Sequence, residues 1–93
     1  MPLNLPPGVK PPLSKVDAAV LIETYTPMNR EDAADILAAP PDAAAALVTL
    51  YAATGQMPRD SWAIFMSIVR VTVDVANIVI PIAGALAAFG VKL

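Results

Sequence analysis

The side chains in this sequence that could do chemistry are its acids and bases, because the chain contains neither histidine nor cysteine. Histidine is the commonest general base and metal ligand, and cysteine is the commonest structural zinc ligand. Glu31, Asp32, Asp35 and Asp42 lie close together in the sequence, but they lack the glycine and the terminal glutamate of a calcium-binding loop. Helix capping and solvation explain these four acids. We therefore expect no catalytic residue, no metal ion and no cofactor.

A second set of polar and small side chains recurs in steps of three and four toward the C-terminus, a spacing that places them on one face of a helix. Its members are Ser67, Arg70, Asp74, Asn77, Pro81, Gly84 and Ala88. Polar and small residues commonly hold packed helices together, so this line predicts a helix–helix or oligomer interface. In such a helix Arg70 and Asp74 form an i, i+4 pair, within one subunit or between two. The alternatives are the lining of an aqueous pore and a narrow wet side of a helix in water.

Nearly every residue between 61 and 89 that is off this line is apolar, which predicts one long, buried C-terminal helix. Residues 71–91 carry one formal charge over 21 positions, or about 31 Å of helix, close to the thickness of a bilayer core. The helix is therefore expected in a membrane or between subunits. Two basic residues, Arg59 and Arg70, flank the N-terminal side of this span, and only Lys92 flanks the other side. The positive-inside rule therefore predicts that the N-terminal domain lies on the cytoplasmic or interior side.

A competing pattern covers residues 69–75, where valines alternate with Arg70, Thr72 and Asp74 as in a half-buried strand. The β-branched side chains of this segment also favour a strand. The helix is the preferred interpretation, because its three-and-four spacing extends from residue 60 to residue 88. A lone strand would also lack a partner strand elsewhere in the chain.

The first half of the chain predicts an extended arm followed by a small helical domain. Five prolines in residues 1–13 prevent a helix, and the apolar residues of this arm are expected to clasp a neighbouring subunit. They are Leu3, Leu5, Val9 and Leu13. Ser14, Asn29 and Asp42 predict the starts of three short helices within residues 14–57, and residues 58–93 form the third region, with the long helix.

The amino-acid composition indicates that the chain needs binding partners. Hydrophobic residues make up 57% of the 93 residues and charged residues only 15%, so an isolated chain would expose apolar surface. The net charge is −2 and the basic residues do not cluster, which argues against nucleic acid as a partner, and no small-molecule substrate is expected. We therefore expect an all-α, non-catalytic structural or accessory subunit of a membrane complex or a viral particle, with protein subunits and a lipid bilayer as partners. A holin-like pore-forming oligomer and a soluble shell or ring protein are the alternatives.

Overall fold

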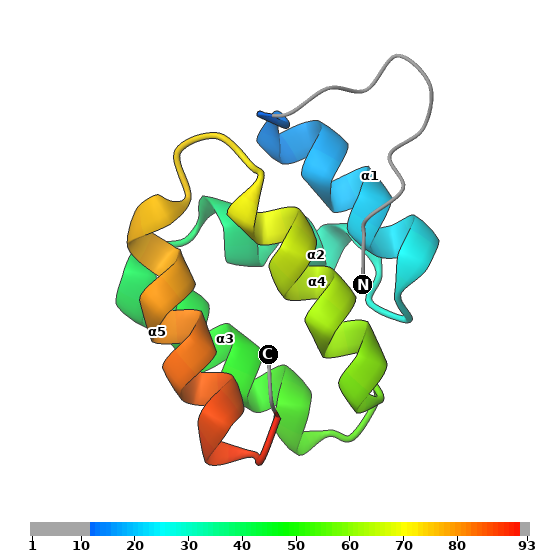
Figure 1. Cartoon of the computed structure of the whole chain (residues 1–93), viewed down its shortest axis with the longest axis vertical. Coiled ribbons are helices and arrows are strands. Elements are labelled where there is room, and N and C mark those ends of the chain that lie inside the picture. Colours follow the sequence, from blue (N-terminus) through cyan, green and yellow to red (C-terminus); the bar gives the residue numbers. More distant parts are fainter. Residues whose placement is uncertain (1–11, 92–93) are drawn as a thin grey trace.

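The computed structural model of the protein describes residues 12–91, and the described part of the chain is all-helical (Figure 1). The five helices are α1 (Lys15–Tyr25), α2 (Arg30–Ala38), α3 (Pro41–Ala53), α4 (Arg59–Arg70) and α5 (Ala76–Ala88). Helix α5 lies alongside α3, α1 packs against both α2 and α4, and α2 also packs against α3. The prediction of an all-α fold is confirmed.

The starts of the first two helices follow the local signals in the sequence. The hydroxyl of Ser14 accepts a hydrogen bond from the backbone N–H of Asp17 at 3.1 Å, and the side-chain oxygen of Asn29 accepts one from Asp32 at 2.8 Å. Both bonds satisfy backbone donors that a helix leaves free at its first turn. Helix α3 starts two residues earlier than expected, with Pro41 at its first position and Asp42 in its first turn rather than at its cap.

The prediction of a single long C-terminal helix is wrong, because the chain turns at residues 71–75 and forms the two helices α4 and α5 instead. Asp74 has a φ of 61°, a left-handed conformation that no continuous helix contains and that aspartate tolerates better than most residues. The segment is rich in β-branched residues, which favour helices weakly. The turn lets α5 pack along α3, so that the apolar sides of both α4 and α5 are buried within one chain.

The same break divides the expected membrane span of residues 71–91. Among residues 12–91, no helix is both long enough and apolar enough to cross a bilayer.

Residues just before α1 are attached to the α4–α5 turn by two backbone hydrogen bonds. The N–H of Leu13 donates to the carbonyl of Val71, the N–H of Val73 donates to the carbonyl of Leu13, and both bonds are 2.7 Å long. They form one isolated parallel bridge between Leu13 and Thr72. The alternative prediction of a strand over residues 69–75 is therefore also wrong, although Thr72 within that stretch forms a strand-like bridge to Leu13.

The core is centred on α4, which buries its aromatic and large aliphatic side chains. The ring of Trp62 meets the ring of Phe65 edge-to-face, with centroids 5.5 Å apart, and meets Tyr51 of α3 in the same manner at 6.1 Å. Such edge-to-face pairs add to the energy of apolar burial. Leu13 is only 1% exposed and belongs to the same core. The N-terminal segment is therefore anchored to the fold at this residue.

Candidate protein-binding surface

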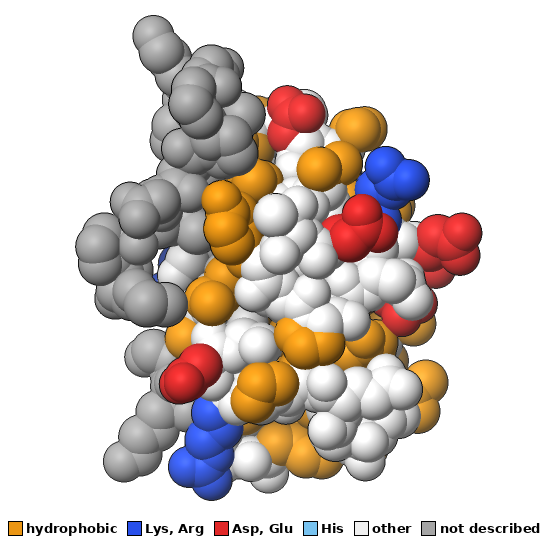
Figure 2. Space-filling model, turned by 90° about the vertical axis from the view of Figure 1, so that its right-hand side faces the viewer, with side chains coloured by type: hydrophobic (Ala, Val, Ile, Leu, Met, Phe, Trp, Pro, Cys, Tyr) orange, Lys and Arg blue, Asp and Glu red, His pale blue; other side chains and the backbone are white. Residues whose placement is uncertain are grey.

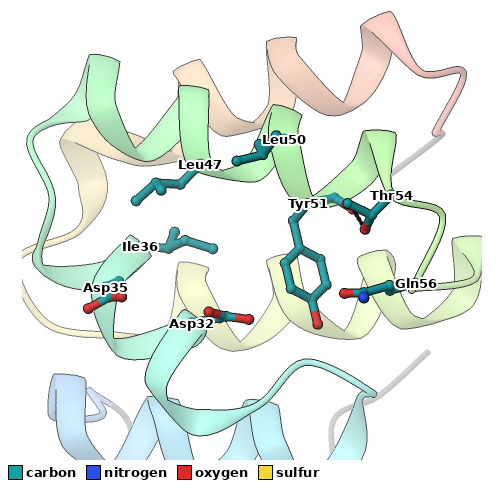
Figure 3. Close-up of a pocket in the computed structure, with 8 residues that line it drawn as sticks. All are labelled: Asp32, Asp35, Ile36, Leu47, Leu50, Tyr51, Thr54 and Gln56. Carbon is teal, nitrogen blue, oxygen red and sulfur yellow. Dashed lines mark hydrogen bonds between the residues drawn. The ribbon is translucent and has the colours of Figure 1, made fainter.

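A groove with apolar walls and two carboxylates lies between α2 and α3 (Figure 3). Its volume is about 210 Å³. Helix α2 contributes two acids and an isoleucine, and α3 and the residues after it contribute the rest. The lining residues are Asp32, Asp35, Ile36, Leu47, Leu50, Tyr51, Thr54 and Gln56. The spacing of Leu47, Leu50 and Tyr51 on α3 places all three toward this side of the helix.

The apolar wall of the groove is open to solvent. Leu50 is 65% exposed and Leu47 is 38% exposed, although both are large aliphatic residues of a regular helix. Ile36 is buried at the base of the wall. Because burying a leucine side chain is worth about 1.5–3 kcal/mol, an apolar ligand would gain by covering these two.

Tyr51 is held firmly within the groove. Its ring stacks edge-to-face on Trp62, and its backbone carbonyl accepts a hydrogen bond from the Thr54 hydroxyl at 2.6 Å. The phenol points toward Asp32 and Gln56 (Figure 3). Burial raises the pKa of Tyr51 above its ordinary value of 10.0, and the negative charge of Asp32 raises this pKa further. The phenol is therefore neutral at physiological pH and suited to hydrogen bonding.

Replacing Asp32 by asparagine is expected to lower the pKa of Tyr51, because it removes a negative charge that disfavours the phenolate. The pKa should stay above 10.0, since burial acts in the same direction. Titration of the phenolate absorbance in a Tyr25→Phe background measures it, because Tyr25 is the only other tyrosine. An unchanged pKa would contradict the placement of Asp32 beside the ring.

The same shift has a consequence for stability at high pH. A pKa that is higher in the folded state means that the folded protein retains the Tyr51 proton where the unfolded chain has lost it. The contribution of Tyr51 to the free energy of unfolding is therefore complete below pH 10.0 and is lost as the pH rises through the folded-state pKa. Tyr51→Phe should therefore flatten the fall in stability above pH 10.0.

Charged residues are unevenly distributed among the helices. In the view of Figure 2, charged side chains stand in small groups, and hydrophobic side chains reach the surface between them. Helix α5 carries no charged residue, and α3 carries only Asp42. Ile80, on α5, is 81% exposed. The α3–α5 side of the molecule thus combines exposed apolar side chains with almost no charge.

The structure separates the seven residues expected to form one interface. Ser67 is half-buried in α4, where its hydroxyl donates to the carbonyl of Ala63 at 2.9 Å, and Arg70 is the exposed last residue of that helix. Asp74 lies in the turn, so the helical i, i+4 pairing with Arg70 does not exist. The other members of the line lie on α5, and three of them share its exposed side. These are Asn77, Gly84 and Ala88, and Pro81 is half-buried beside them.

The residues of the expected clasping arm are divided as well. Leu3, Leu5 and Val9 lie outside the described residues. Leu13 packs in the core of its own chain, so it is not free to contact a neighbour. The groove itself was not anticipated from the sequence, where Asp32 and Asp35 are explained by capping and solvation. The signal that could have indicated it is the i, i+3, i+4 spacing of Leu47, Leu50 and Tyr51 in a helix that otherwise consists mostly of alanine.

Among residues 12–91, no three acidic side chains gather closely enough to hold a metal ion. Comparison of the chain with protein-family models, with curated proteins and with solved structures finds no match.

Proposed function

We propose that the protein is a non-catalytic structural or accessory subunit of a larger assembly, and that its α2–α3 groove binds the proline-rich arm of a neighbouring copy. The observation that carries the proposal is an apolar groove whose Leu47 and Leu50 remain exposed beside the carboxylates of Asp32 and Asp35. Exposed large aliphatic residues next to two negative charges favour a partner segment that is apolar and basic.

The arm has this chemistry. Leu3, Leu5 and Val9 supply apolar side chains, and Lys10 supplies a cation that complements the two aspartates. Prolines in general favour extended conformations in a free chain, which would reduce the entropy lost when such a segment binds. The arm departs from Leu13, which is fixed to the α4–α5 turn, so each subunit would present it from a defined point.

The length of the arm also suits an exchange between subunits. Residues 1–11 would span roughly 34 Å when extended, at about 3.1 Å per residue. The longest dimension of the domain is 35 Å. An arm of this length can cross the surface of a neighbouring copy and reach a groove on it.

The polar groups of the groove support binding rather than catalysis. A phenol whose pKa is raised is a poor nucleophile at neutral pH, and Asp32 lies beside it as a fixed negative charge. The groups are suited to anchoring a lysine and a backbone amide. The membrane and virion settings expected from the sequence stay predictions, and recovery of the protein with or without detergent tests the first of them.

A labelled peptide of residues 1–11 tests the proposal by fluorescence anisotropy with the full chain. We expect binding in the range of about 10–500 µM, since the contact is small and the peptide is ordered on binding. The double variant Asp32→Asn/Asp35→Asn should weaken binding about tenfold, and a peptide with Lys10→Glu should bind equally poorly.

Asp60→Asn provides the matched control, because this acid lies at the start of α4 and does not line the groove. It should leave the affinity unchanged. Saturable binding that is lost with the groove variant and kept with the control supports the proposal. An absence of binding at millimolar peptide, or equal losses in both variants, contradicts it.

A further inference from the structure

The exposed side of α5 combines a large apolar residue with a glycine one turn away. Ile80 is 81% exposed, and Gly84 lies four residues further along the same exposed side of the helix. The opposite side of α5 supplies Ile78, Ile82 and Leu86 to the core, so the outward direction of Ile80 follows from the helical repeat. No residue in the described range 12–91 covers this side chain.

Gly84 is not required by the fold of the single chain. A Cβ at this position would meet no atom of the described residues within 4 Å, and its φ is not in the left-handed region that only glycine adopts readily. Glycine inside a helix is less favourable than alanine because it loses more backbone entropy on folding. An open glycine in a helix interior is therefore explained best by something that approaches its surface closely.

A two-fold axis through the centre of α5 would exchange the positions of the two residues. Helix α5 runs from Ala76 to Ala88, and its centre falls at Ile82. Two copies of the helix that pack antiparallel about this centre bring Ile80 of each copy against Gly84 of the other. The same operation pairs Asn77 with Ala87, and Ala76 with Ala88, and all of these residues are exposed.

We propose that two copies of the chain associate through antiparallel α5 helices, with Ile80 of each packed over Gly84 of its partner. The absence of charge on α5 supports a second copy as the occupant, because the face then meets an identical uncharged face. A lipid surface fits less well, since helices that lie on membranes carry lysine or arginine on their polar side. This contact is separate from the α2–α3 groove, and it holds whether or not the groove binds the arm.

The contact is small, so the dimer should be weak. A 13-residue helix is about 20 Å long, and a pair of such faces buries less than the roughly 1,000 Å² of a stable interface. Weak contacts of this kind suit an assembly, where several of them act together. Sedimentation of the full chain over a range of concentrations up to millimolar should show a reversible monomer–dimer equilibrium.

Substitutions at the two key positions test the packing. Ile80→Gln and Gly84→Gln should each raise the dimer dissociation constant by about tenfold or more, and helical content should be unaffected because both side chains face open space. The exchanged variant Ile80→Gly/Gly84→Ile restores a large residue opposite a glycine and should recover association. Failure of this rescue in a folded protein would overturn the proposal.

Cross-linking tests the relative direction of the two α5 helices. The sequence contains no cysteine, so only the introduced cysteines react. An equal mixture of Asn77→Cys and Ala87→Cys proteins should give mainly mixed dimers with a short bifunctional maleimide. Asn77→Cys alone should cross-link poorly, because antiparallel packing leaves its two copies about 15 Å apart along the axis.

Three further results would overturn the proposal. The first is a monomer at every concentration, and the second is cross-linking of Asn77→Cys with itself as readily as with Ala87→Cys, which would indicate parallel helices. The third is a monomer that binds phospholipid vesicles and loses that binding with Ile80→Gln, since the face would then serve a membrane.

Discussion

Replacing Phe65 by alanine is expected to bring the protein close to unfolding. Phe65 is completely buried in α4 and packs edge-to-face on Trp62, which in turn packs on Tyr51 of α3. Truncation of a buried phenylalanine costs about 3–5 kcal/mol, because apolar contacts are lost and a cavity remains. A chain of 93 residues has a total stability of about 5–14 kcal/mol, so this loss is a large part of it.

Urea unfolding followed by far-ultraviolet circular dichroism measures the effect without relying on Trp62, the single tryptophan, whose fluorescence Phe65 would perturb directly. Leu50→Ala is the matched control, since Leu50 is 65% exposed and its truncation should change the free energy of unfolding little. A Phe65→Ala protein that loses no more stability than this control would show that the core is not centred on α4.

Leu13→Ala is expected to cost about 2–5 kcal/mol, an unusual loss for a residue outside every helix. The side chain is 1% exposed, and its backbone holds the α4–α5 turn through the bonds to Val71 and Val73. Removing the side chain leaves a cavity at the point where the N-terminal segment, α4 and α5 meet. The turn should then open more readily, because its two backbone bonds depend on the same residue.

Val16→Ala serves as the control for Leu13→Ala. Val16 lies three residues away in the first turn of α1 and is 73% exposed, so its truncation should be nearly neutral. Denaturant unfolding compares the two free energies, and hydrogen exchange at Val73 reports on the turn directly. Equal stability of the two variants would contradict the anchoring role of Leu13.

The helices of the first half could be predicted well because their signals are local. Ser14 and Asn29 cap α1 and α2 as expected from their positions. Gly55, just after α3, adopts a positive φ, the conformation that glycine supplies most readily at the end of a helix. Each of these signals acts within about four residues, so no knowledge of the rest of the chain is needed.

The C-terminal half could not be predicted in the same way. The three-and-four spacing from residue 60 to residue 88 continues through the turn, so periodicity alone does not reveal that Asp74 is left-handed. The alternating residues 69–75 also fit a strand, whereas in the structure residues 69 and 70 end α4 and residues 71–75 form a turn with one bridge to Leu13. Of the interface expected from the sequence, only the residues on α5 remain together on an exposed face.

The amino-acid sequence by itself determined that the chain is helical, where its first helices begin, and that it has more apolar surface than an isolated small domain needs. These properties follow from residue types and from interactions between near neighbours. Only the tertiary structure decided that α4 and α5 are separate helices, that Leu13 belongs to the core, and that Leu47, Leu50 and Ile80 remain outside. The reason is that folding back buries the apolar sides of both helices at once, a gain that depends on residues far apart in the chain.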